Sequence, residues 1–231
     1  MPRPPRIHVP GCSVHVIHRG NNRTAIFADD EDCEMYLSMV RRLTIASDVE
    51  LHAFALMKTH DHLLVTPRTA TALPRAMRRL GTTYVRYFNR KYARTGTLFN
   101  ERYKGLIVTD DRYWLTCLRY IEQNPVRAAI VDRPEDYRWS SYRVHVGLEK
   151  SDWVKSHPVF DALGHELPQR FAVYRAICAA SLTDAELIAQ RLGTDPGRSQ
   201  LRPGSVPGSD DPNSDNSARV TAGSGIDAPA A

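Results

Sequence analysis

Two histidines separated by a single residue, His60 and His62, are the side chains whose types and spacing suggest metal chemistry in this sequence. They lie in the segment FALMKTHDHLLVTP, which is otherwise largely apolar. Alternation along a β-strand would put both imidazoles on one face of a sheet, where they could bind one divalent ion. Histidines in an apolar strand are more often structural than ligating, so a metal site needs a third ligand from elsewhere in the chain.

A second candidate group lies on a helix that the pattern predicts over 111–123. The pair Asn124-Pro125 should end this helix, because the residue before proline disfavours helical geometry. Tyr120 and Asn124 are four residues apart and are therefore neighbours on the helix surface. A phenol beside an amide oxygen could supply a nucleophile and a metal ligand together. Helical spacing alone favours a plainer interpretation, in which Tyr120 is an aromatic residue at the boundary of the core.

Positive charge is concentrated between these two groups. The chain of 231 residues has a net charge of +5, and residues 68–104 contain ten lysines and arginines against one acid, Glu101. Such a block indicates a surface for a polyanion, most simply a nucleic acid, although a solvated helix face has the same composition.

The hydrophobic pattern predicts seven elements that would position these groups, in the order βαββαβα. The strands are expected over 13–19, 49–57, 60–66 and 105–109, and the helices over 28–46, 73–92 and 111–123. The first six elements indicate an α+β fold, a ferredoxin-like or RRM-like antiparallel sheet with helices on one face. The third helix is an addition that is free to lie where a site needs it.

The chain is expected to divide into three parts. Residues 1–164 form the main domain, 165–194 a C-terminal helical extension with helices over 171–180 and 183–193, and 195–231 a disordered tail rich in Gly, Pro, Ser and Asp. No run of eighteen apolar residues and no signal-peptide core is present, so we expect a cytoplasmic protein without a membrane span. The four cysteines are scattered and form no CxxC pair.

Several motifs together resemble those of the HUH single-tyrosine transposases, most closely the REP-associated tyrosine transposase branch. They are ALMKT before HDH, then ERYKGLIV, RYIEQNPVRAAIV and YRWSSY, and the resemblance spans about residues 9–164. The resemblance implies that residues 1–164 are a transposase domain with Tyr120 as its catalytic nucleophile. It also implies that His60, His62 and Asn124 bind Mg²⁺ or Mn²⁺, with Gln123 and Glu122 as weaker substitutes for Asn124.

The implied reaction is cleavage and rejoining of single-stranded DNA beside a hairpin, such as a REP-like element or an insertion-sequence end. Tyr120 would form a 5′-phosphotyrosine link and release a 3′-OH, and the protein would act as a monomer or homodimer. The DNA contacts are expected from the basic residues Arg19, Arg23, Arg75, Arg78, Arg79, Arg86, Arg90, Arg102 and Lys104.

One residue departs from the family pattern. The middle position of HUH is usually bulky and hydrophobic, and here it is Asp61, which a regular strand would aim at the helix-covered core. Burial of a carboxylate is costly unless it is paired, for example with an arginine, or protonated, or the strand begins only after it. An alternative function is therefore a domesticated, non-catalytic nucleic-acid-binding protein. A metallohydrolase that uses the histidine pair would leave Tyr120 without a role, and the sequence contains no HExxH motif or further His/Asp cluster to support it. An HD-type phosphohydrolase would need a helical context and partner histidines that the sequence lacks.

Overall fold

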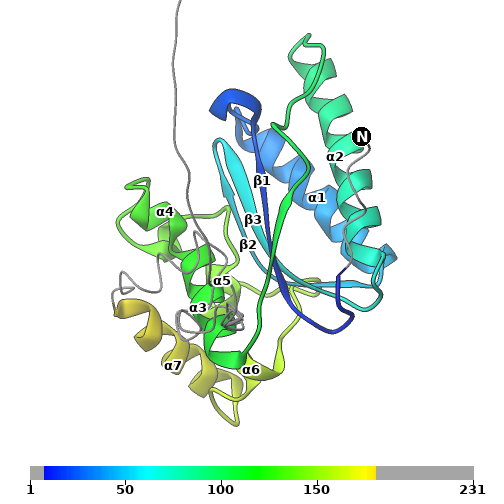
Figure 1. Ribbon diagram of the computed structural model, residues 1–231. Helices are drawn as coiled ribbons and strands as arrows, with labels where there is room; N and C mark the ends of the chain where they lie inside the picture. The colour runs from blue at the N-terminus through cyan, green and yellow to red at the C-terminus, as the bar shows by residue number, and fades with distance from the viewer. Residues whose placement is uncertain (1–7, 181–231) are drawn as a thin grey trace, which may run out of the picture. The chain divides into compact units, whose positions relative to one another are not determined.

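The computed structural model describes residues 8–180, and its centre is one antiparallel sheet (Figure 1). The strand order is β2-β3-β1-β4, formed by β1 (Val14–Arg19), β2 (Val49–Met57), β3 (His60–Pro67) and β4 (Lys104–Ile107). β1 pairs with β3 and with β4, so β2 and β4 are the edges. This order, with a helix after β1 and after β3, is that of a ferredoxin-like sandwich, and the predicted fold class is confirmed.

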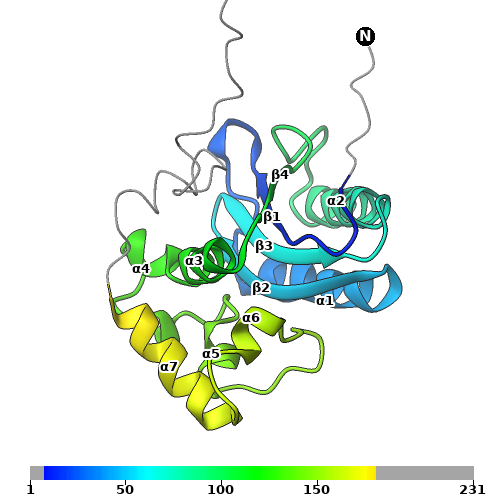
Figure 2. The ribbon, with the colours of Figure 1, turned by 60° about the horizontal axis from the view of Figure 1, so that its bottom comes forward.

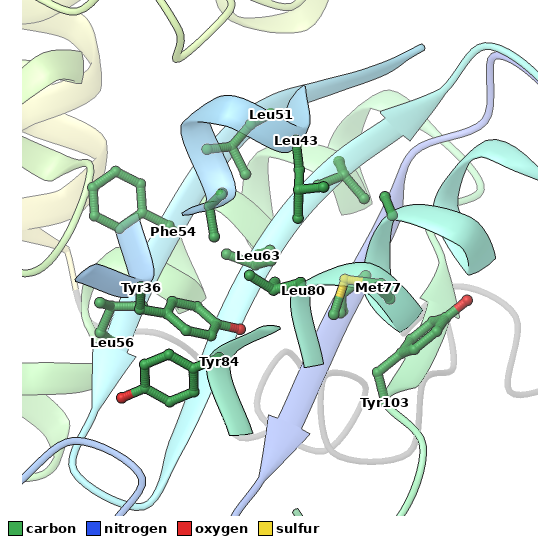
Figure 3. Close-up of a cluster of buried hydrophobic side chains, with 14 of the residues drawn as sticks. Tyr36, Leu43, Leu51, Phe54, Leu56, Leu63, Met77, Leu80, Tyr84 and Tyr103 are labelled. Carbon is green, nitrogen blue, oxygen red and sulfur yellow. The ribbon is translucent and has the colours of Figure 1, made fainter. Parts of the chain in front are cut away.

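Two long helices, α1 (Asp30–Ala46) and α2 (Ala72–Lys91), cover one face of the sheet (Figure 2). The acidic start of α1 forms a capping box, in which Asp29 accepts from the Asp32 backbone and Asp32 accepts from the Asp29 backbone. Figure 3 shows the core between the layers, where Tyr36 and Tyr84 from the two helices meet side chains of the sheet such as Leu63.

The predicted third helix, α3 (Asp111–Glu122), packs on the opposite face of the sheet (Figure 2). Asp110 caps the start of α3, because its carboxylate accepts from the Tyr113 backbone N–H. The stripe of Trp114, Leu118 and Ile121 on α3 is buried. A further helical turn, α4 (Asn124–Arg127), follows immediately. The prediction that the helix stops at Asn124-Pro125 is therefore only partly right. Proline is tolerated in the first turn of a new helix, where its missing N–H has no partner to lose.

The chain after residue 131 covers the exposed edge of β2. It contains the short elements η2 (Pro134–Asp136), α5 (Tyr142–His145) and α6 (Pro158–Asp161). The Leu56 N–H donates to the Trp139 carbonyl at 2.9 Å, and the Lys155 N–H donates to the Leu51 carbonyl at 2.7 Å. This segment therefore satisfies backbone groups that an open edge strand would leave unpaired.

The last described helix, α7 (Leu167–Ala179), begins four residues before the predicted start at 171. Pro168 lies in its first turn, where proline is favoured. Tyr174 and Cys178 of α7 belong to the same buried cluster as α3. The extension therefore shares a core with the main domain as far as the structure describes it. The predicted helix over 183–193 and the tail over 195–231 lie outside the described residues, and the boundary at 164 stays a prediction.

Two smaller differences concern local boundaries. β4 begins and ends slightly before the expected 105–109. The segment between the first predicted strand and the first predicted helix contains a 3-10 turn, η1 (Asn21–Arg23), with Asn22 at a positive φ of 50°. Within residues 8–180, no helix is both long and apolar enough to cross a membrane.

Candidate active site

His60 and His62 point to the face of the sheet that α3 covers, and the centroids of their rings are 5.0 Å apart. Alternation along β3 thus brings the two imidazoles together as predicted. They border a cleft of about 260 Å³ that Tyr120 of α3 also lines. The histidine pair and the tyrosine, 58 residues apart in the sequence from His62 to Tyr120, therefore share one site within a single chain.

Each of these histidines has one ring nitrogen held by a neighbour. His15 Nε2 of β1 lies 2.8 Å from His62 Nδ1, and Thr59 Oγ1 lies 3.1 Å from His60 Nδ1. Engagement of Nδ1 leaves Nε2 as the ligating atom, the arrangement in which neighbouring groups orient metal-bound histidines. His62 Nε2 is buried and has no hydrogen-bond partner in the described chain. The two side chains therefore fit a metal ion bound through Nε2.

The surroundings of both imidazoles favour their neutral form. Burial and, to a smaller extent, the charge of Arg19 together lower the pKa of His60 to about 4. Burial also holds the pKa of His62 well below its usual range, with smaller contributions from His15 and His60. Neutral imidazoles have the lone pairs that metal binding requires.

Tyr120 lies against the histidines, and the residue is only 9% exposed. Its ring centroid is 5.9 Å from that of His62 and 6.0 Å from that of His15, both in edge-on arrangements. The Tyr120 hydroxyl makes no hydrogen bond to any residue from 8 to 180 and is the polar end of a ring that lines the cleft. A phenol so placed is available to a substrate that enters beside the imidazoles.

The three candidates for a third metal ligand have different positions. Asn124 Nδ2 donates to the Tyr120 carbonyl at 2.9 Å, and the amide oxygen has no hydrogen-bond partner in the described chain. Asn124 is not among the residues that line the cleft. Gln123 instead donates to the Cys178 carbonyl. Glu122 is fully buried away from the cleft and accepts from Ser141 Oγ at 2.5 Å.

The histidines do not form a complete metal centre with other acidic or sulfur ligands. In the part of the chain that the structure describes, no three His, Cys, Asp or Glu side chains are grouped to hold an ion. An amide oxygen or an atom of the substrate could complete the coordination at this cleft.

The basic residues expected to contact DNA divide between several surfaces. Arg19, Arg102 and Lys104 line the cleft beside the histidines. Arg75 and Arg78 are exposed on α2 and line a second groove, which Arg102 also borders. The exposed side chains of Arg23, Arg79, Arg86 and Arg90 line neither of these cavities.

Sequence reasoning missed two residues of the site, and one of them is Arg127 of α4. Its guanidinium carbon is 4.7 Å from the centroid of the Tyr120 ring, within the range of a cation–π contact. The spacing of seven residues from Tyr120 could have indicated this contact, because i and i+7 lie on one helix face. The expected stop at Pro125 concealed the continuation of the helix.

The other missed residue is His15, which lies in the strand predicted over 13–19. It is fully buried and pairs with His62 across β1 and β3. In the observed register Ile17, and not His15, is opposite His62, so the contact is diagonal between neighbouring strands. Only knowledge of the strand order and register could have revealed it.

Asp61 points to the face opposite the histidines and is completely buried under α1 and α2. β3 includes Asp61, so the possibility that the strand begins only after this residue is wrong. No described arginine forms an ion pair with Asp61, so the possibility of pairing with an arginine is wrong as well. Burial raises the pKa of Asp61 to about 8, and the nearby Tyr36 hydroxyl opposes part of that rise. The carboxyl group is therefore protonated at neutral pH, which avoids the cost of burying a charged carboxylate.

Comparisons with known proteins concern the family and the fold of this chain. Residues 8–124 match the family described as "Transposase IS200 like". The chain is similar to a solved REP-associated tyrosine transposase bound to a REP hairpin, with 16% identity over 69% of this chain and 96% of that chain and a TM-score of 0.54. A protein of Deinococcus radiodurans R1 named as a transposase has 20% identity over 58% and 96% of the two chains, with a TM-score of 0.37. The first likeness supports the fold, and the second is too distant to support an argument. No curated protein matches the chain.

Proposed function

The chain belongs to the IS200-like transposase family, and from that premise we propose that it cleaves and rejoins single-stranded DNA beside a hairpin through a covalent link to Tyr120. The observation that supports this proposal most directly is the shared cleft of Tyr120, His60 and His62, in which the tyrosine is 5.9 Å from His62 between ring centroids.

In the proposed reaction the Tyr120 oxygen attacks the scissile phosphorus and forms a phosphotyrosine bond. The bond from phosphorus to the 3′ oxygen breaks, the 3′ oxygen takes a proton from solvent and leaves as the 3′-OH, and the phenolic proton leaves to solvent through the cleft. Attack by another 3′-OH on the same phosphorus reverses these changes and joins the strands. The phosphotyrosine preserves the energy of the phosphodiester, so no nucleotide cofactor is required.

The chain's own side chains prepare this step. Arg19, Arg102 and Lys104 would bind the phosphates that enter the cleft, and Arg127 against the Tyr120 ring would favour negative charge on its oxygen. His15 would hold His62 in the tautomer that leaves Nε2 as an acceptor.

A divalent ion, Mg²⁺ or Mn²⁺, would be held by Nε2 of His60, Nε2 of His62 and the amide oxygen of Asn124. Such an ion neutralises phosphate charge and orients the phosphate for in-line attack. The buried Nε2 of His62 without a hydrogen-bond partner fits this role, and the unbonded amide oxygen of Asn124 is a suitable third donor.

Because the histidines and Tyr120 come from one chain, we propose that a monomer contains a complete site and that dimerisation is not needed to assemble it. Because the proposed substrate is DNA, we place the reaction in the cytoplasm.

The test is a covalent adduct between protein and DNA. Hairpin oligonucleotides with single-stranded flanks are incubated with the full chain, with and without Mg²⁺ or Mn²⁺, and resolved under denaturing conditions. We expect a metal-dependent adduct that Tyr120→Phe abolishes while DNA binding is kept. Tyr113→Phe is a matched control, since Tyr113 lies on the same helix but does not line the cleft.

Other outcomes would support other functions. Binding without an adduct on any hairpin would favour the non-catalytic DNA-binding alternative. Metal-dependent cleavage that survives Tyr120→Phe would contradict the tyrosine mechanism and favour a metallohydrolase.

A further inference from the structure

A second, large cavity bordered by basic residues adjoins the catalytic cleft. We propose that this cavity, which we call the α2 groove, holds unpaired nucleobases of the DNA strand whose phosphate lies in the cleft. The α2 groove has a volume of about 800 Å³ and lies between α2 and residues 97–103. This inference rests on the proposed function, because it assigns a second contact of the same strand.

The chemistry of the α2 groove suits a base with its phosphate. His18 and Phe99 stack with ring centroids 3.5 Å apart and an angle of 9° between the planes, and they line the groove with Met77 and Tyr103. Figure 3 shows Met77 and Tyr103 at one side of the core cluster. Arg75 and Arg78 are exposed on α2 at the same groove. The four side chains other than the arginines are mostly buried, and their exposed edges form an apolar wall. Apolar surface with adjacent arginines is the combination that binds single strands, through base and phosphate contacts.

The position of the α2 groove connects it to the catalytic cleft. Asn100, Glu101 and Arg102 line both cavities. The backbone N–H of Asn100 donates to the Arg19 carbonyl at 3.0 Å, so this segment continues along β1 beyond β4. A strand bound at the histidines on one face can therefore pass over this segment and reach the α2 groove on the other face.

A glycine in the middle of α2 is a further argument that the groove holds a ligand. Gly81 lines the groove and has no positive φ, so its backbone does not require glycine. A Cβ built at this position would meet only His18 Cε1, at an ordinary contact distance of 3.6 Å. Glycine in a helix interior is unfavourable relative to alanine, yet packing does not demand it here. The missing side chain leaves space in the groove that a large residue would fill.

The experiment compares strands with and without bases. Full-length protein is kept in EDTA to prevent cleavage, and its affinity is measured by fluorescence anisotropy for an oligonucleotide of about twelve thymidines and for an abasic strand of the same length. We expect thymidine strands to bind roughly tenfold more tightly, because stacking adds to phosphate contacts. Gly81→Leu should abolish this preference while the affinity for the abasic strand is unchanged.

Matched variants separate the groove from the helix. Thr82→Leu places the same side chain at the next, exposed position of α2 and should keep the preference, as should Gly81→Ala. Arg78→Gln should weaken the binding of both strands, whereas Arg86→Gln, an exposed residue of α2 outside the groove, should weaken them less. A preference for thymidine that Gly81→Leu leaves intact would overturn the inference.

The same oligonucleotides distinguish this inference from the proposed function. If metal yields a Tyr120 adduct but Gly81→Leu still prefers thymidine, the groove assignment fails and the proposed function stands. If no adduct forms but Gly81→Leu removes the preference, the groove assignment stands and the catalytic proposal fails.

Discussion

Asp61→Asn should stabilise the protein increasingly as the pH rises, because the native carboxyl group is buried and protonated. The pKa of Asp61 is raised from 3.8 to about 8 by burial, and its side chain is 0% exposed. The folded chain therefore keeps a proton that the unfolded chain loses above about pH 4. Stability is highest below the unfolded pKa and falls until the pH reaches the folded pKa near 8.

The magnitude follows from the difference in proton binding. Between about pH 5 and pH 7 the free energy of unfolding should fall by about 1.4 kcal/mol per pH unit because of this residue alone. At neutral pH this residue lowers the free energy of unfolding by about 4 kcal/mol relative to strong acid. Asparagine has the same shape and does not titrate, so the difference between the variant and the wild type should grow by about 2 to 3 kcal/mol over the interval.

Urea unfolding of both proteins in EDTA, measured across that interval, tests the reasoning. Asp132→Asn, at an exposed aspartate, controls for the loss of a carboxylate elsewhere. A difference between Asp61→Asn and wild type that stays constant with pH would refute the protonated carboxyl group. Adduct formation should be kept in Asp61→Asn, since this side chain lies on the opposite face from His60 and His62.

Three further substitutions test the surroundings of Tyr120. His15→Phe should lower Mn²⁺ affinity by about 10- to 100-fold in calorimetric titration, because His62 loses the partner that orients it. Arg127→Gln should slow adduct formation roughly two- to tenfold with hairpin binding kept, because the cation over the Tyr120 ring is removed. Glu122→Ala should lower the free energy of unfolding by roughly 3 kcal/mol or more in urea, because three buried polar side chains lose their acceptor.

Each of these substitutions has a control of the same chemical type. His52→Asn changes another buried histidine of the sheet, which bonds Thr66 and the Lys155 carbonyl, and should leave Mn²⁺ affinity unchanged. Arg133→Gln removes an exposed arginine that does not contact Tyr120, and Glu149→Gln removes an exposed carboxylate. Equal effects of a substitution and its control would contradict the corresponding role.

The elements of the sheet and its helices could be predicted because their signals are local. β2 has the expected bounds, and α1, α2 and α3 agree to within two residues. The alternation that puts His60 and His62 on one face also puts Asp61 on the other, and both consequences hold. The continuation of the helix past Pro125 was not predictable in this way, because proline ends one helix and begins another by the same geometry.

The sequence alone determined which residues are candidates for chemistry and which face of its own element each one occupies, since periodicity and capping depend on neighbours in the chain. Tertiary structure decided which of those faces meet. It brought Tyr120 to the histidines, set His15 against His62 through the strand register, and left Asp61 without an arginine. It also put the arginines of α2 on the side of the sheet away from Tyr120, around a groove that no local pattern indicates. These contacts join residues distant in sequence, and only the packing of layers fixes their distances.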